Sequence, residues 1–270
     1  MSVLVRSWNL FHGNTNPPGR VAHLDRMVRL AVEDDPDLVL LQEVPAWALR
    51  RLDDWSERRA VGDVAAPPTL GPIPSTYWIG HALTALNPGL LRSAFSGQAN
   101  AILVAPRLRM EAHEQLVLNP PGFRRREARR LGLRVLPRLA WAGERRVCQA
   151  LRVVLADGRT AVVANLHATS YPPDDRLAEA ELRRAADWVD GLARPDDVVV
   201  LGGDLNQRGG SSAVLEELSG EGYSAPCPGI DHILVRVAEL ERPLSRWPDE
   251  RRLLDGKLLS DHTPVELTIR

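Results

Sequence analysis

Six short stretches of the chain carry side chains that can bind a metal ion or move a proton. They hold Asn9, Glu43, Asn165 with His167, Asp204 with Asn206, Asp231 with His232, and Asp261 with His262. Oxygen atoms of acids and amides suit hard cations such as Mg²⁺ or Mn²⁺, whereas a zinc site more often recruits several His or Cys side chains. Neither G-x-S-x-G nor H-E-x-x-H occurs, which argues against serine and zinc hydrolases. The set therefore indicates metal-assisted attack of water on a phosphate ester.

These side chains stand at the ends of apolar segments that are typical of strands. "SVLVRSW" at 2–8 precedes Asn9, "LVLL" at 38–41 leads to Glu43, and "DVVVLGG" at 197–203 precedes Asp204. Strands of open α/β sheets deliver functional side chains at their ends, so residues far apart in the sequence can meet in one cleft. We therefore expect the six stretches to form one site.

The segments between these strands predict an α/β fold. Apolar residues recur at helical spacing over 21–32, which gives a β-α-β unit at the start, and a second amphipathic helix is expected over 174–192. Asp157-Gly158 is a strong hairpin signal between two strands. Shorter helices are expected at 45–52 and 211–219, and further strands at 76–81, 100–105, 230–236 and 263–269. Residues 119–145 give no clear pattern, and we expect one domain over residues 1–270.

The composition excludes several classes of protein. The formal net charge of −1 indicates neither a disordered chain nor a polycation that coats nucleic acid, so any anion site must be local. Cys148 and Cys227 lack metal-binding spacing and are expected to be free thiols in a reducing compartment. No apolar run approaches membrane-spanning length, and the first residues lack a signal-peptide apolar region. We expect a soluble, cytoplasmic protein, and no obligate protein partner is evident.

Seven short motifs, in order along the chain, resemble those of the endonuclease/exonuclease/phosphatase superfamily. They are "SWN" at 7–9, "LVLLQEV" at 38–44, "NAIL" at 100–103, "ANLHA" at 164–168, "LGGDLN" at 201–206, "IDHILV" at 230–235 and "SDHTPV" at 260–265. Each is weak alone, but their common order over almost the whole chain is a specific signal. The resemblance implies a four-layer α/β sandwich, in which two packed mixed β-sheets are flanked by helices, and metal-dependent hydrolysis of phosphoesters.

The resemblance also implies a role for each matching residue. Glu43 would be the central Mg²⁺ or Mn²⁺ ligand, with Asn9 beside it and Asp261 as a further carboxylate on the metal side. Asp204 would orient or deprotonate the attacking water or bind a second metal ion, and Asn206 would hold a phosphate oxygen or that water. The two imidazoles would face the phosphate: His262 as a donor held by Asp231, and His167 with the substrate-binding Asn165 near it on one strand.

Other residues admit a structural interpretation beside a functional one. His232 alternates with Asp231 along a strand and should face away from the site, so we predict a structural role. His12 follows Asn9 closely, yet only this proximity argues for a function. Asn100 is a candidate substrate contact or a support for the sheet. The run "FRRREARRLGLR" at 123–134 includes Arg124 and Arg125, which are candidates for gripping phosphates or belong to a solvated face.

The substrate is the weakest part of the prediction. The apurinic-site branch of the superfamily has a Lys two residues after the motif glutamate, whereas this chain has Pro45 there. This departure lowers the case for an abasic-site repair enzyme. A nuclease acting on DNA or RNA is the first hypothesis, and a phosphatase or phosphodiesterase of lipid, inositol or other small phosphoesters is the second. A non-catalytic binding protein is less favoured, because every acid and histidine of the motifs is present.

Overall fold

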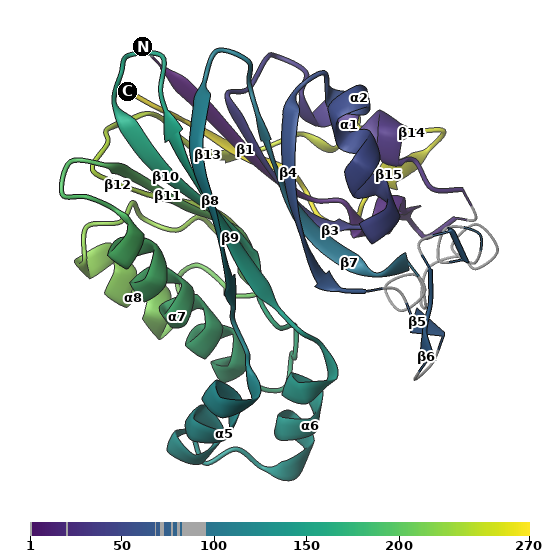
Figure 1. Ribbon diagram of the computed structural model, residues 1–270, viewed down its shortest axis with the longest axis vertical. Coiled ribbons are helices and arrows are strands. Elements are labelled where there is room, and N and C mark those ends of the chain that lie inside the picture. Colours follow the sequence, from purple (N-terminus) through teal and green to yellow (C-terminus); the bar gives the residue numbers. More distant parts are fainter. Residues whose placement is uncertain are drawn as a thin grey trace.

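A computed structural model describes residues 2–19, 21–67, 69–70, 73–76, 78–79, 82 and 96–270. Of the strand expected at 76–81, residues 77, 80 and 81 lie outside these residues, and residues 78–79 are helical rather than extended. Two large mixed sheets face each other, with helices on both outer faces (Figure 1). The described residues thus form the four-layer α/β sandwich, with two packed mixed β-sheets flanked by helices, that the sequence predicts.

The first sheet has the strand order β13-β16-β1-β3-β7-β4. Its strands are β13 Leu240–Arg246, β16 Val265–Ile269, β1 Val3–Asn9, β3 Leu38–Val44, β7 Gln98–Val104 and β4 Arg59–Ala66. On its outer face lie α1 Leu24–Ala31, α2 Leu52–Ser56 and the 3-10 turn Ala46–Arg51. Small pieces complete this half: the turn Phe11–Gly13, β2 Thr15–Asn16, β5 Thr69–Leu70, β6 Ile73–Pro74, the turn Asp249–Arg252, β14 Leu253–Leu254 and β15 Lys257–Leu259.

The second sheet has the order β12-β11-β10-β9-β8. Its strands are β12 Asp231–Arg236, β11 Val198–Asp204, β10 Thr160–His167, β9 Val147–Val154 and β8 Arg109–Val117. Two helices, α7 Arg176–Leu192 and α8 Ala213–Gly220, cover its outer face (Figure 1). β9 and β10 form the expected hairpin around Asp157-Gly158, with Val154 opposite Thr160.

The central strands read as continuous apolar runs because both of their faces are covered. In β3, Leu38 and Leu40 belong to the core between the sheets, while Val39 and Leu41 pack under α1. β11 divides in the same way, with Val200 between the sheets and Leu201 under α7. Alternation along each strand therefore builds three cores, and polar side chains remain only where these runs end.

Each sheet contains one parallel pair of strands that runs toward the same end of the sandwich. β1 lies parallel to β3, with Asn9 opposite Gln42, and β10 lies parallel to β11, with His167 opposite Asp204. β12 is antiparallel to β11 and starts at this end, so Asp231 lies opposite Asp204. The polar residues predicted from the strand ends therefore face each other across the seam of the two sheets.

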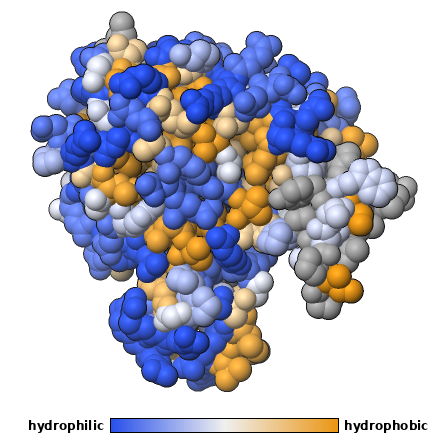
Figure 2. All heavy atoms as spheres, in the orientation of Figure 1, coloured by the Kyte–Doolittle hydropathy of each residue, from blue (hydrophilic) through white to orange (hydrophobic). Residues whose placement is uncertain are grey.

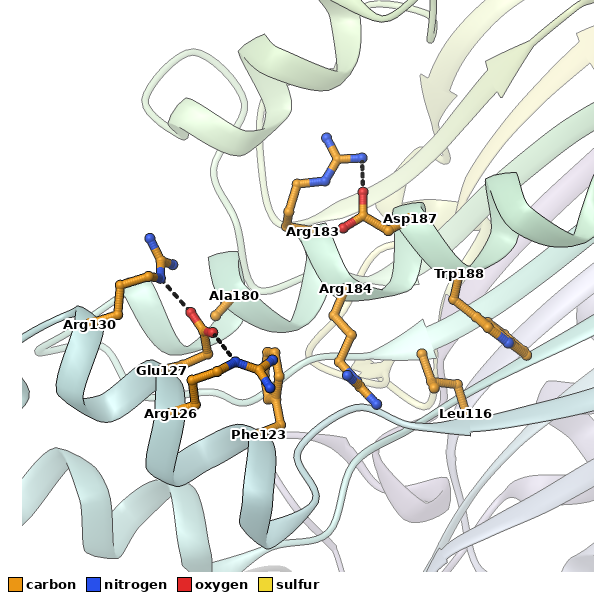
Figure 3. Close-up of a pocket in the computed structure, with 10 residues that line it drawn as sticks. All are labelled: Leu116, Phe123, Arg126, Glu127, Arg130, Ala180, Arg183, Arg184, Asp187 and Trp188. Carbon is orange, nitrogen blue, oxygen red and sulfur yellow. Dashed lines mark hydrogen bonds and ion pairs between the residues drawn. The ribbon is translucent and has the colours of Figure 1, made fainter.

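Residues 119–145, unassigned from sequence, form a small helical lobe between β8 and β9. It consists of α5 Pro121–Arg130 and α6 Val135–Gly143 (Figure 1). Phe123 and Trp141 meet edge to face with ring centroids 5.9 Å apart, which joins the two helices. α5 also meets α7 beside a groove of about 480 Å³, where Glu127 pairs with Arg126 and Arg130 (Figure 3). The lobe projects from the sheet end that carries His167.

Both cysteines are free, as expected: Cys148 is buried in the core and Cys227 is half-buried. None of the helices in the described part of the chain is both long and apolar enough to cross a membrane.

Candidate active site

Glu43 enters the seam because the backbone of β3 bends just before it. The register between β3 and β7 shifts between Leu41 and Val44, and Glu43 has φ of +51°. Such bulges redirect a side chain, and left-handed non-glycine residues are found preferentially at functional sites. The bend brings Glu43 Oε1 to 3.1 Å from Asn9 Nδ2. Asn9 Nδ2 also donates to Asp204 Oδ2 at 3.0 Å, so one amide joins acids from both sheets.

His12 also belongs to the site, although only its closeness to Asn9 in the sequence had argued for it. It too adopts a left-handed backbone, with φ of +53°, and its Nε2 lies 3.2 Å from Glu43 Oε2. Burial alone would raise the pKa of Glu43, but the hydrogen bond and charge of His12, aided by His167 and Asn9, lower it below its usual value. Glu43 therefore stays ionised although it is partly buried. Only the three-residue spacing from Asn9 could have pointed to His12.

Asp204 ends β11 at a point where the chain requires glycine. Gly203 has φ of +131°, and a Cβ there would lie 2.0 Å from the carbonyl oxygen of Leu166. This close approach of β11 to β10 places Asp204, which is 2% exposed, beside the ends of β1 and β12. Burial, followed by the charge of Asp231, raises the pKa of Asp204 to about 7. Asn206 closes this turn, with φ of +49°, its backbone N–H on Asp204 Oδ1 at 3.1 Å, and its Nδ2 on the Ala168 carbonyl at 3.0 Å.

Asp231 and His262 form a tight pair at the mouth of the cleft. His262 Nδ1 lies 3.0 Å from each carboxylate oxygen of Asp231, and its Nε2 lies 3.7 Å from Asp204 Oδ2. Burial would lower the pKa of His262, but the hydrogen bond and charge of Asp231, with the charge of Asp204, raise it to about 10. The imidazole is therefore protonated at neutral pH, and its Nε2–H lies on the side of Asp204 and Asp261.

The loop that carries His262 is held in place by buried polar contacts. Arg252, only 4% exposed, donates through NH1 to the carbonyls of Leu259 and Ser260 at 3.1 and 2.9 Å. Ser260 Oγ donates to the Asn9 carbonyl at 2.7 Å and accepts from the backbone N–H of His262 at 3.0 Å. Trp8 Nε1 donates to the His262 carbonyl at 3.1 Å. Sequence reasoning missed Arg252, because an arginine ten residues away carries no local signal.

His167 faces the same acids from β10. Its Nδ1 is 2.8 Å from Gln98 Nε2 and 3.1 Å from Arg146 NH1, two groups that can only donate. Burial, followed by the charge of Arg146, lowers the pKa of His167 well below its ordinary value. A neutral ring that accepts at Nδ1 must carry its proton on Nε2, which lies 3.4 Å from Asp204 Oδ2. Gln98 and Arg146, both missed from sequence, thus set its tautomer.

Asp261 lies at the rim, with its side chain 41% exposed and its Oδ1 4.0 Å from His262 Nε2. Burial raises its pKa, followed by the opposing charge of His262 and the like charges of Glu43 and Asp231. Asp204, Asp231 and His262 can also offer ligand atoms within 4.8 Å of one another. A protonated His262 has no lone pair to offer a metal, however. The carboxylate and amide oxygens around Glu43 therefore fit a hard cation better than this group does.

Two residues that were predicted to contact the substrate are buried in the structure. Asn165 is fully buried; its Nδ2 donates to the carbonyls of Leu41 and Ala101 at 2.9 Å, and its Oδ1 accepts from Gln42. It ties the two sheets together and has no surface for a substrate. Asn100 is 1% exposed and donates to the Val147 carbonyl at 3.0 Å. We therefore propose neither residue as a substrate contact.

The remaining predicted residues lie outside this cluster. Arg124 and Arg125 stand on α5, where Arg124 NH1 donates to the Trp141 carbonyl at 3.3 Å and Arg125 is exposed. His232 faces the other side of β12, fully buried, with Nε2 2.8 Å from the Gln207 carbonyl, as its alternation with Asp231 indicates. The structure thus brings together Asn9, Glu43, His167, Asp204, Asn206, Asp231, Asp261 and His262 from the predicted set.

Solved structures with the same fold include TDP2, an endonuclease/exonuclease/phosphatase and a protein of unknown function. Truncated TDP2 of Caenorhabditis elegans shares 19% identity at a TM-score of 0.62, covering 100% of this chain and 97% of that one. A conserved protein of unknown function from Enterococcus faecalis V583 shares 14% at a TM-score of 0.68, with 99% of each chain covered. An endonuclease/exonuclease/phosphatase from Bacteroides vulgatus shares 14% at 0.66, with 100% and 99% covered. These likenesses show the fold.

Sequence comparison identifies the family. A search of curated protein sequences gave no significant match. The profile of the Endonuclease/Exonuclease/phosphatase family, in contrast, matches residues 7–262. This span begins at the motif that contains Asn9 and ends at His262, so it includes every residue of the clustered site. The chain belongs to the endonuclease/exonuclease/phosphatase family.

Proposed function

We propose that this protein is a Mg²⁺- or Mn²⁺-dependent phosphodiester hydrolase whose first substrate class is nucleic acid. The observation that carries the proposal is the convergence of two donor imidazoles and an ionised, partly buried Glu43 around Asp204, where the two sheets meet. A phosphodiester is anionic, so hydrolysis needs cationic donors for the phosphoryl oxygens and a group that takes a proton from water. The seam supplies both kinds of group.

The donor set fits a hard divalent cation. Carboxylates of Glu43, Asp204, Asp231 and Asp261 crowd this seam, and burial together with their like charges raises the pKa of Asp204 and of Asp261. Glu43 and Asp261, with Asn9 beside them, would hold the cation. A bound cation would supply Lewis-acid polarisation of a phosphoryl oxygen and neutralise its charge.

The protein's own groups would do the remaining work. His262, held by Asp231, directs an N–H into the cleft, where it can donate to a phosphoryl oxygen as negative charge develops. His167 offers a second N–H from the opposite strand pair. Asp204 lies between them and accepts from Asn9, so its carboxylate is placed to orient water and take its proton. Asn206 stands two residues further on and would orient the water or a phosphate oxygen.

Arginines on α5, at the sheet end that bears His167, favour a polyanionic substrate. α5 carries Arg124 and Arg125, and it projects from the sheet end that bears His167. We propose these two side chains for contacts to phosphates that flank the scissile bond. Hydrolysis of a lipid or other small phosphoester is the second candidate, and exposed apolar side chains on α6 favour it.

Chelation and a substrate panel test the proposal. Purified protein should hydrolyse bis(p-nitrophenyl) phosphate with Mg²⁺ or Mn²⁺, stop with EDTA, and recover when the metal is restored. Glu43→Gln should lower the rate and weaken Mn²⁺ binding measured by electron paramagnetic resonance, whereas Glu217→Gln on α8 serves as the matched control. Activity that persists in EDTA would exclude the metal mechanism. Plasmid, single-stranded DNA, RNA, inositol phosphates and sphingomyelin, tested in parallel, would then identify the substrate class.

A further inference from the structure

α6 presents apolar side chains to solvent on the catalytic end of the molecule. Val135, Leu136 and Leu139 are 68%, 72% and 62% exposed. Trp141 on the same helix is 1% exposed and packs on Phe123. The side of α6 that carries Trp141 is therefore packed against the protein. Its other side is apolar, and no element in the described part of the chain covers it. Such a patch on a water-soluble domain marks a contact surface.

The same lobe concentrates positive charge. Residues 120–146 hold nine arginines and two glutamates, a formal charge of +7, whereas the whole chain carries −1 and the remainder therefore −8. Arg134 and Arg138, both exposed, flank the apolar residues of α6, and no acid occurs between residues 128 and 143. Figure 2 shows this lobe as a protrusion with hydrophilic and apolar surface side by side. The contact surface is thus both apolar and cationic.

Contacts to α7 and to His167 hold the lobe beside the clustered site. Trp141 Nε1 donates to Glu181 Oε1 on α7 at 2.6 Å, and Arg184 of α7 stands over the Phe123 ring at 4.7 Å. Phe123 and Arg184 line the groove between α5 and α7 that is drawn in Figure 3. Arg146, just after α6, contacts His167 at 3.1 Å. A partner bound to α6 would therefore lie next to the clustered site.

The chemistry of α6 identifies one occupant. A nucleic acid backbone offers phosphates for the arginines but nothing apolar for the three aliphatic side chains. A second copy would bring one +7 lobe against another, which opposes association. An anionic bilayer satisfies both features, because lipid phosphates attract arginines and the acyl boundary accepts aliphatic groups. We propose that α6 docks the protein onto the surface of an anionic phospholipid bilayer.

Vesicle co-sedimentation tests this docking without using activity. The full chain should pellet with vesicles of phosphatidylcholine and phosphatidylglycerol, and binding should weaken as salt rises. The double variant Leu136→Gln with Leu139→Gln should bind about tenfold more weakly or worse, because two aliphatic groups no longer reach the acyl boundary. Arg134→Gln with Arg138→Gln should lose the preference for anionic vesicles. Leu253→Gln, an exposed leucine on β14, is the matched control and should bind as the unchanged protein does.

Three results would overturn the proposal. The first is absence of vesicle binding, or equal binding by the leucine variants that still unfold at the normal temperature. The second is a dimer in sedimentation equilibrium that the leucine variants dissociate, which would assign the face to a second copy. The third is tight binding of a 30-nucleotide duplex that the leucine variants lose while vesicles do not bind. Because every readout is binding, failure here leaves the proposed phosphodiester hydrolysis to its own test.

Discussion

His262 Nδ1 lies 3.0 Å from both carboxylate oxygens of Asp231, and the opposite nitrogen of the ring points toward Asp204. One acid therefore fixes the orientation and charge of the imidazole that faces Asp204. Asp231→Asn should leave the fold intact, since the amide fills the same space. It should lower kcat for a phosphodiester by about 10²- to 10⁴-fold, the usual contribution of one positioned proton donor, with a smaller change in KM.

A matched acid elsewhere separates this effect from a general loss of stability. Asp190 accepts from Tyr223 and Arg236 at 2.6 and 2.8 Å on the far side of the second sheet. Asp190→Asn should reduce stability without lowering kcat. Equal kcat in Asp231→Asn and the unchanged protein would contradict the role of the pair.

Arg252 should matter for both stability and rate, although it does not reach the cleft. Arg252→Met removes the donors that hold the carbonyls of Leu259 and Ser260, and it leaves those buried acceptors without partners. We expect the free energy of unfolding to fall by about 2–4 kcal/mol, measured by urea denaturation. The rate should fall as well, because His262 lies two residues beyond Ser260. Arg242→Met, an exposed arginine on β13, should change neither quantity.

Glu181 should make stability depend on pH in an identifiable direction. It is fully buried and accepts from Trp141 Nε1 and from both donors of Thr169, yet burial outweighs these bonds and raises its pKa above the ordinary 4.5. An acid whose folded pKa is raised contributes stability that is fully present below 4.5 and is lost as pH rises through the raised value. The free energy of unfolding, relative to that of Glu181→Gln, should therefore decrease as pH rises from 4 to 8.

A control acid makes this test specific. Glu217 is exposed on α8, and Glu217→Gln should keep the pH dependence of the unchanged protein. A difference between the unchanged protein and Glu181→Gln that stays constant with pH would show that Glu181 titrates alike in the folded and unfolded states. That outcome would contradict the prediction.

Two glycine substitutions should have opposite effects on stability. Gly203→Ala would place Cβ 2.0 Å from the Leu166 carbonyl oxygen at φ of +131°, so the two strands must separate where Asp204 stands. This variant should lose activity and unfold at a much lower temperature. Gly191→Ala on α7 meets nothing within 4 Å and should raise stability by about 0.5–1 kcal/mol. Thermal unfolding of both variants measures the contrast, and similar melting temperatures would contradict it.

The buried half of the fold was predictable because its signals are local. β3 and β11 are continuous apolar runs that end in polar residues, and the Asp157-Gly158 turn marks a hairpin. The edge strands β8 and β13 escaped prediction because most of their side chains are exposed and follow no apolar alternation. The lobe escaped because α5 is arginine-rich and buries little beyond Phe123, Glu127 and Ala128.

The site was predictable where residue type and strand position agree. Glu43, Asp204 and Asp231 sit at strand ends, and their residue types alone mark them as candidates for metal binding and proton transfer. Gln98, Arg146 and Arg252 support them only through tertiary contacts, which no spacing reveals. Asn165 misled the prediction for a physical reason: a buried amide at a strand end can serve a substrate or satisfy carbonyls of the facing sheet. Only its four partner groups in space distinguish these roles.

The hydrogen bond from Asn9 to Asp204 crosses from one sheet to the other. The proposed reaction depends on both sheets. Asn9 and Glu43 belong to the first sheet, whereas His167, Asp204 and Asp231 belong to the second. Activity should therefore depend on the packing of the two sheets against each other. In a denaturant titration, activity should vanish together with the core between the sheets.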